Sequence, residues 1–488
     1  MTKLLTVICF VSLSLHCFSQ TKKIDSLNNL ISRASSDTQR LNYMNAKARL
    51  VGEVNLDSAI AIFLTVIDQS QKIGYSKAEA EARYRLAGKY CFKGMFEEAH
   101  QNLVTAEKIL STLNDSTGIA NCKKLYGTYY SIQNRYDSGI YYNKEAIQIA
   151  ERHQLNDLIK DCCNNIGNAY MMQSDFSNAL LYFQKGLRVA EKDNDTNSQS
   201  YLLLNIGITY KSLNDNVAAE KNLLKTIRLA QKDNSVVVEL YACSNIASVY
   251  SIMGQNDLGY SYAIKAVELA EKAGDNGMIA TNLSRAAHEL AKSGKFDEAR
   301  DLFLNLHSRF PEKADVCFEI GRIALKKGDL SEAEEYFTKC IALEPLRPEP
   351  RIELGKMWYD SGYYHKSADS FTEALVFDPD NPEIRTYLGL ISHKLDKPED
   401  AERWFRESLD YDPDNTETLF YCARLYEEMG RWEDELWCYN RLIEIDPEQV
   451  IPWLKKGMLY LSRDDLSMAV SFFRMASRLD ADSHLPHL

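Results

Sequence analysis

The apolar and small residues of this chain recur at intervals of three and four, which places them on one side of an α-helix. Ile166, Gly167 and Tyr170 stand at positions i, i+1 and i+4 of one stretch, and Ala179 and Phe183 stand four apart in the next. Short runs rich in Asn, Asp, Gly or Pro separate these stretches and are typical of turns. The pattern predicts pairs of amphipathic helices joined by short turns, and therefore an all-α chain.

In the second part of the chain the pairs repeat every 34 residues. No proline precedes residue 311, and prolines then follow at this interval: Pro311, Pro345, Pro379, Pro413 and Pro447. A small residue stands 24 positions before each proline, and the series continues once more: Ala287, Gly321, Gly355, Gly389, Ala423 and Gly457. A large ring stands 16 positions after each small residue: Phe303, Phe337, Phe371, Phe405, Tyr439 and Phe473. Because proline disfavours the helix before it, each proline ends a pair, and residues 280–483 are predicted to form six 34-residue units.

The first part of the chain keeps the same phase with a period of 40 residues. Its small residues are Ala87, Gly127, Gly167, Gly207, Ala247 and Ala287, and tyrosines follow the first five by three positions. The six extra residues are predicted to lengthen both helices before an Asn, Asp or Gly turn, as at 192–195 and 273–276. Residues 40–279 are therefore predicted to form six 40-residue units, which makes about twelve helical hairpins in all.

Both ends of the chain differ from the repeats. Residues 1–19 read as a secretory signal, because Lys3 precedes an apolar run over 4–15 and small residues precede a cut before Gln20. A membrane anchor is the alternative, but the run is shorter than the roughly 20 apolar residues that span a bilayer. Residues 20–39 carry an apolar stripe and are predicted to form a helix that caps the first unit.

At the other end, the last helix carries Met468, Phe472 and Met475, and only a short tail at 484–488 follows it. This helix is expected to expose an apolar side that could support self-association. The alternative is that the neighbouring helix uses the whole stripe.

The fixed register of small residue, ring and proline resembles the tetratricopeptide repeat from about Arg40 to Ser483. The 40-residue units are similar to the longer repeats of peptide-binding members and of sensor regions in bacterial signalling proteins. The resemblance implies an α-solenoid, a right-handed superhelix in which the first helix of each pair lines a concave groove. It also implies a protein or peptide partner that binds in this groove.

A row of amides is the clearest candidate for a binding surface. Asn45, Asn165, Asn205 and Asn245 occupy the sixth place of their units, and Asn164 and Asn168 lie beside the second of them. A primary amide both donates and accepts hydrogen bonds, so a row of amides can pair with the backbone of an extended peptide. The resemblance carries a peptide-binding role to the four sixth-place positions. The alternative is that these amides satisfy the protein's own backbone.

The row is not continuous, because Arg85, Leu125 and Arg285 stand at the sixth place of the second, third and seventh units. Further side chains are predicted to line the groove of the 40-residue units: Tyr84, Arg85, Lys124, Tyr201 and Tyr241. Tyrosine suits a binding surface because it combines a large contact area with a polar tip.

The sequence offers no catalytic, cofactor or metal motif. It has no Gly-rich phosphate loop, His-Glu-x-x-His, paired Cys-x-x-Cys or Gly-x-Ser-x-Gly, so we expect a protein that is not an enzyme and uses no cofactor. Cys317 with Cys340, and Cys422 with Cys438, have spacings that could place them side by side in a hairpin. Each pair could form a disulfide, and the alternative is two buried thiols.

Charge is unevenly distributed along the 488 residues. From Ala314 onward 36 acidic residues face 21 basic ones, whereas the preceding residues carry a net charge of +3. An acidic surface repels phosphate, so nucleic acid is not expected as a partner.

From the predicted signal and the resemblance together, we expect an exported interaction scaffold, periplasmic or associated with the outer membrane of a Gram-negative bacterium. The alternative is a sensor module that acts through a separate signalling protein.

Overall fold

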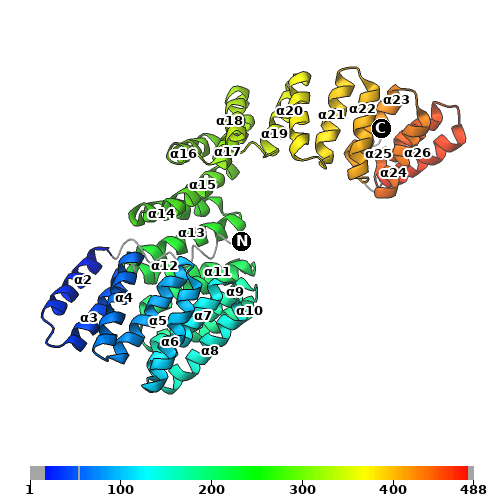
Figure 1. Cartoon of the computed structure of the whole chain (residues 1–488). Helices are drawn as coiled ribbons and strands as arrows, with labels where there is room; N and C mark the ends of the chain where they lie inside the picture. The colour runs from blue at the N-terminus through cyan, green and yellow to red at the C-terminus, as the bar shows by residue number, and fades with distance from the viewer. Residues whose placement is uncertain (1–16, 53–54, 482–488) are drawn as a thin grey trace. The chain divides into compact units, whose positions relative to one another are not determined.

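The computed structural model describes residues 17–52 and 55–481, and within them it contains 25 α-helices and no strand (Figure 1). The predicted all-α solenoid of about twelve hairpins is therefore confirmed. Except for the first residues of α2, the predicted signal at 1–19 lies outside the described residues, as does the predicted tail at 484–488.

The chain divides into two compact units, which we call the front unit (Met1–Leu302) and the rear unit (Phe303–Leu488). The helices of the front unit are α2 (Cys17–Ser32), α3 (Asp37–Val51), α4 (Leu56–Lys72), α5 (Ser76–Lys93), α6 (Phe96–Thr112), α7 (Ser116–Ile132), α8 (Tyr136–Arg152), α9 (Asn156–Met172), α10 (Phe176–Lys192), α11 (Thr196–Ser212), α12 (Asn216–Lys232), α13 (Val236–Ile252), α14 (Asn256–Ala273) and α15 (Asn276–Lys292). The boundary falls inside α16 (Phe296–Arg309). The helices of the rear unit are α17 (Ala314–Lys327), α18 (Leu330–Leu343), α19 (Glu349–Asp360), α20 (Tyr364–Phe377), α21 (Pro382–Lys394), α22 (Pro398–Tyr411), α23 (Thr416–Glu428), α24 (Trp432–Ile445), α25 (Val450–Leu461) and α26 (Leu466–Ala481).

The turns of the front unit follow a rule that the apolar pattern did not show. From Gly74 to Gly294 a residue with positive φ recurs every 20 positions, and it is Gly, Asn, Gln or Ser. Each 40-residue unit is thus two halves, each made of a helix of about 17 residues and a three-residue turn. Gly and Asn tolerate the left-handed conformation best, which explains why they predominate at these turns.

Helix packing separates an inner from an outer layer in the front unit. Each helix packs against the next one along the chain, and each odd-numbered helix from α3 to α15 also packs against the next odd-numbered helix. Successive even-numbered helices make no comparable contact within the described residues. The odd-numbered helices are therefore the more closely spaced layer, and we call the surface formed by α3, α5, α7, α9, α11, α13 and α15 the inner wall.

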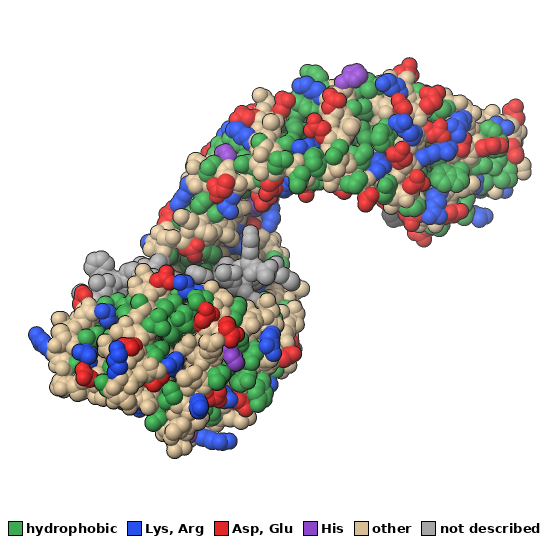
Figure 2. Space-filling view, viewed as in Figure 1, with side chains coloured by type: hydrophobic (Ala, Val, Ile, Leu, Met, Phe, Trp, Pro, Cys, Tyr) green, Lys and Arg blue, Asp and Glu red, His purple; other side chains and the backbone are tan. Residues whose placement is uncertain are grey.

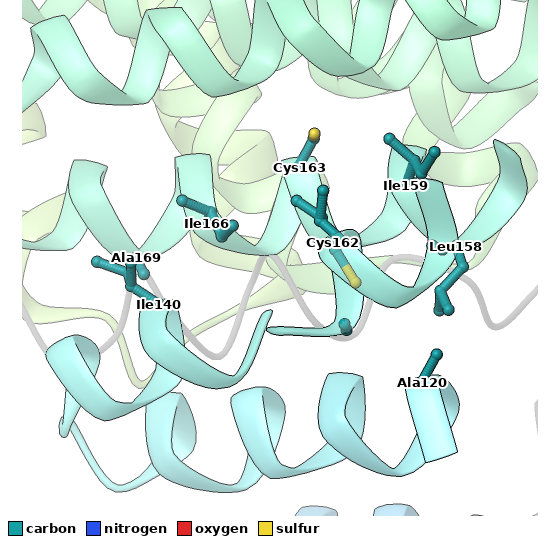
Figure 3. Packing of buried hydrophobic residues seen from close by; sticks show 11 residues of the cluster. Ala120, Ile140, Leu158, Ile159, Cys162, Cys163, Ile166 and Ala169 are labelled. Carbon is teal, nitrogen blue, oxygen red and sulfur yellow. The ribbon is translucent and has the colours of Figure 1, made fainter. Parts of the chain in front are cut away.

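The core lies between successive hairpins. Ala120 on α7, Ile140 on α8 and Ile159 on α9, labelled in Figure 3, belong to one buried cluster. Cys162 and Cys163 belong to the same cluster, but their sulfur atoms point in different directions. Adjacent residues of a helix leave it about 100° apart, so these two thiols pack into different parts of the core.

In several hairpins the repeated glycine of the first helix lies directly against a ring of the second. A Cβ atom built on Gly389 of α21 would lie 2.5 Å from the ring of Phe405 on α22, which is 1% exposed. Gly321 and Gly355 stand in the same relation to Phe337 and Phe371. The glycine allows the ring to lie against the helix backbone, and this close approach sets the packing of the two helices.

Candidate functional site

All predicted groove residues lie on the odd-numbered helices, and so on the inner wall. They are Asn45 on α3, Tyr84 and Arg85 on α5, Lys124 on α7, Asn164, Asn165 and Asn168 on α9, Tyr201 and Asn205 on α11, and Tyr241 and Asn245 on α13. The inner wall therefore gathers side chains that are up to 200 residues apart in the sequence.

The four sixth-place amides do not form a row of equivalent groups. Asn45 is 1% exposed, and its Nδ2 donates a hydrogen bond to the carbonyl oxygen of Ala78 at 3.1 Å. Asn165 Nδ2 lies 3.4 Å from Asn143 Oδ1, which belongs to the even-numbered helix α8. These two amides bond inside the protein, as the alternative interpretation of the sequence expects.

The other two amides connect neighbouring helices of the inner wall. Asn205 Nδ2 donates to Asn164 Oδ1 at 2.7 Å, which joins α11 to α9. Asn245 Nδ2 donates to the carbonyl oxygen of Tyr241 at 2.9 Å, and Asn245 Oδ1 accepts a hydrogen bond from Lys211 Nζ at 2.6 Å. Both amides are half-buried. An extended ligand would have to bond to the amide atoms that these internal hydrogen bonds leave unused.

A cavity of about 170 Å³ brings three of the predicted residues together between α3, α5 and α7. Tyr84, Arg85 and Lys124 line it, together with Arg49 and the half-exposed ring of Phe92. Arg85 pairs with Glu81 at 2.8 Å, and Lys124 pairs with Asp161 at 2.7 Å. Burial raises the pKa of Tyr84, so its hydroxyl stays protonated. This end of the inner wall is amphipathic, and two of its cations already have carboxylate partners.

A second cluster, which the sequence analysis missed, lies on α11, α13 and α15. Lys211 bonds to Asn245, while Arg285 Nη1 donates to the carbonyl oxygen of Ser244 at 2.8 Å, to Ser244 Oγ at 3.0 Å and to Asn282 Oδ1 at 3.1 Å. We call Lys211 and Arg285 the cationic pair. Burial and the charge of Arg285 lower the pKa of Lys211 to about 8, and burial also lowers the pKa of Arg285.

Two tyrosines lie on the helices that carry Lys211 and Asn245. Tyr201 on α11 is 37% exposed, and Tyr241 on α13 is half-buried one turn before Asn245. Burial and the nearby Asp275 raise the pKa of Tyr241 to about 12. Both side chains therefore offer a neutral ring and a protonated hydroxyl.

The remaining candidates lie in the core. Cys317, Cys340, Cys422 and Cys438 are buried free thiols, so the structure contains the alternative to both disulfides. Within residues 17–52 and 55–481 no cluster of three His, Cys, Asp or Glu side chains is arranged to hold a metal ion. No helix in this part of the chain has the length and apolarity needed to cross a membrane.

The last hairpin exposes an apolar face, as the sequence predicts. Met468 and Met475 are each 38% exposed, and a shallow cavity of about 780 Å³ lies along α26 beside Trp453. Nothing in the structure indicates what covers this face, so self-association there stays a prediction. The surface seen in Figure 2 mixes acidic and basic side chains in both units and shows no large patch of one sign.

Comparison with protein families finds the tetratricopeptide repeat. One model of this repeat matches residues 284–348 and 359–416, and another matches residues 161–192. No curated protein matches the chain.

Solved structures with a similar fold include a signal transduction ATPase with numerous domains and a tetratricopeptide repeat sensor, from Pyrococcus horikoshii. It is 14% identical, with a TM-score of 0.51 over 65% of this chain and 51% of the other. MamA is 21% identical and has a TM-score of 0.32 over 34% of this chain and 96% of its own. PilF from Pseudomonas aeruginosa is 17% identical, with a TM-score of 0.35 over 41% of this chain and 91% of its own. The first of these similarities supports the helical-repeat fold of the chain.

Proposed function

We propose, from the premise that the chain is a tetratricopeptide repeat protein, that its front unit binds an extended segment of a partner protein along the inner wall. Repeats of this family are protein-interaction modules, so the chain as a whole is an interaction scaffold. The proposal adds the location of the contact and the extended form of the bound segment. Binding would rest on complementary surfaces without covalent chemistry.

The exposure of Tyr201 on α11, an inner-wall helix that also carries Lys211, is the observation that carries the proposal. Core rings such as Phe183 are fully buried, whereas Tyr201 presents 37% of its surface on a helix of the inner wall. A ring with a polar tip loses little side-chain entropy on binding, which favours it at protein interfaces. Neighbouring amides and cations can satisfy the backbone and side chains of a bound segment.

Two further proposals concern activity and location. The scaffold is proposed to be non-catalytic, because its function needs only the surface of the repeats. It is proposed to act in the cell envelope, because residues 1–19 have the charge, apolar run and small residues of a secretory signal.

Site-specific photo-crosslinking in the native cells tests the binding surface. Tyr201→p-benzoylphenylalanine places a light-activated group on the inner wall, and Tyr141→p-benzoylphenylalanine places it on the even-numbered helix α8, where Tyr141 is 56% exposed. We expect crosslinks from position 201 to one short segment of a partner, located by mass spectrometry, and none to that segment from position 141. Crosslinks to the same segment from both positions, or from 141 alone, would contradict the proposal.

A further inference from the structure

The cationic pair has no negatively charged partner in the described part of the chain. Lys211 makes one hydrogen bond, to an amide oxygen, and Arg285 uses only Nη1, on a carbonyl, a hydroxyl and an amide oxygen. No carboxylate of the described residues lies within 4 Å of either cation. Two hydrogens of the Lys211 ammonium group, and Nε and Nη2 of Arg285, thus make no hydrogen bond to the described residues.

Two acidic residues of α15 and of the turn before it lie in this region, and neither forms an ion pair with Lys211 or Arg285. Glu289, one turn after Arg285 on α15, is 1% exposed and pairs with Lys292 at 3.1 Å. Asp275 caps the start of α15 and accepts a hydrogen bond from the backbone nitrogen of Met278 at 3.0 Å. The charge of Glu289 partly offsets the effect of burial on the pKa of Arg285, but neither Glu289 nor Asp275 bonds to Lys211 or Arg285.

Other lysines of the front unit show the usual arrangement. Lys160 is 4% exposed, but its Nζ lies 2.8 Å from Asp157 and 2.7 Å from Asp195. Lys123 and Lys265 are likewise within 3.1 Å of a carboxylate. These three lysines are paired with acids, and Lys211 is not.

Removing a charge from water without an opposite charge costs free energy, and two neighbouring charges of the same sign add to the cost. The lowered pKa values of Lys211 and Arg285 express this cost. An anion placed between them would restore the missing interaction through charge-assisted hydrogen bonds.

We infer that Lys211 and Arg285 form a carboxylate-binding contact on the inner wall, and that the segment bound there carries Asp or Glu side chains. This inference rests on the proposed function. Asn245 holds Lys211 and Ser244 holds Arg285, so two adjacent residues of α13 position the two donors. Tyr201 and Tyr241 offer apolar contact area elsewhere on α11 and α13.

A labelled acidic peptide tests the inference. The probe alternates Ser and Glu over about nine residues, which spans about 30 Å when extended, or three helix spacings of about 10 Å. It carries fluorescein at its N-terminus and an amide at its C-terminus, so that only side chains supply carboxylates. We expect fluorescence anisotropy to show binding to the full chain, and Lys211→Met and Arg285→Met each to raise Kd roughly tenfold or more.

Three controls separate the contact from general charge. Lys221→Met removes an exposed lysine from the even-numbered helix α12 and is expected to change Kd less than twofold. A Ser-Gln peptide of equal length is expected to bind at least tenfold more weakly than the acidic one. Lys211→Arg keeps the cation and is expected to retain most of the binding, and circular dichroism checks that each variant is folded.

Failure of the inference can be told from failure of the proposed function. Absence of binding of the acidic peptide, equal binding of the Gln peptide, or an equal effect of Lys221→Met would overturn the carboxylate contact. In each case crosslinking from position 201 in cells would still report whether the inner wall binds a partner.

Discussion

Burial of a charge has opposite meanings at two lysines of this chain. Lys160 lies among the carboxylates of Asp157, Asp193 and Asp195; burial lowers its pKa, but these hydrogen bonds raise it well above its usual value. Lys211 has only an amide oxygen, and its pKa falls to about 8. The first arrangement contributes to stability, whereas the second reduces it and leaves hydrogen-bond donors available to a ligand.

A buried glutamate of the rear unit leads to a prediction about pH. Glu435 on α24 is 6% exposed, and burial together with the nearby Glu427 raises its pKa to about 7. At pH values between the ordinary pKa of a glutamate and about 7, Glu435 holds a proton in the folded chain that it has released in the unfolded chain. Stability should therefore fall as pH rises through this window, and Glu435→Gln should remove about 2 kcal/mol of that loss at pH 8.

Urea unfolding at pH 5 and pH 8, followed by circular dichroism, measures this effect. Glu433→Gln is the matched control, because Glu433 lies in the same first turn of α24 and is exposed. Glu433→Gln should change the unfolding free energy at pH 5 and at pH 8 by the same amount. A pH dependence that Glu435→Gln leaves unaltered would show that Glu435 is already ionised in the folded chain near pH 5.

At the scale of the element, the close approach of glycine and ring decides how two helices meet. In α21 and α22, Gly389 allows the ring of Phe405 to lie where a Cβ would otherwise stand. Gly389→Ala should lower the unfolding free energy by about 1–2 kcal/mol, because the clash with a fully packed ring exceeds the gain in helix propensity. Urea unfolding checks the loss.

A double-mutant cycle separates the clash from other effects. Phe405→Leu shortens the side chain that the new methyl group would meet, so Gly389→Ala should cost about 1 kcal/mol less in that background. If the alanine costs the same in both backgrounds, the contact between these two residues is not what requires glycine.

At the scale of the whole molecule, each hairpin depends mainly on its neighbours. Within residues 17–52 and 55–481, the helices that pack closely against each other are one or two elements apart in the chain. In such an array, stability is close to a sum over units and their nearest-neighbour interfaces. A local weakness in the rear unit should therefore leave the inner wall of the front unit intact.

Hydrogen exchange followed by mass spectrometry tests this independence. Gly389→Ala should speed exchange in α19 to α24 and leave exchange in α5 to α14 unchanged. Gly167→Ala brings the same clash against Phe183 in the front unit. It should speed exchange in the helices around α9 and α10 and leave exchange in α19 to α24 unchanged. Faster exchange in both units from either variant would mean that the chain unfolds as one cooperative body.

The hairpins, their two periods and the resemblance to the tetratricopeptide repeat could be read from the sequence, because each rests on local spacing. An apolar stripe, a glycine facing a ring 16 positions later and a proline after the second helix act within one unit. Their effect does not depend on distant partners, so the register of Gly321 with Phe337 and of Gly389 with Phe405 was readable from the order of residues alone.

Which polar groups remain available to a ligand was decided only by the tertiary structure. Asn45, Asn165 and Asn205 occupy equivalent places in the repeat, yet they bond to a backbone carbonyl, to an even-numbered helix and to an odd-numbered helix respectively. Lys160 and Lys211 have the same side chain, and only the helices packed beside them determine that one is neutralised and the other is not. A hydrogen bond or ion pair depends on the atoms that folding brings within about 3 Å, and those atoms come from other units of the repeat.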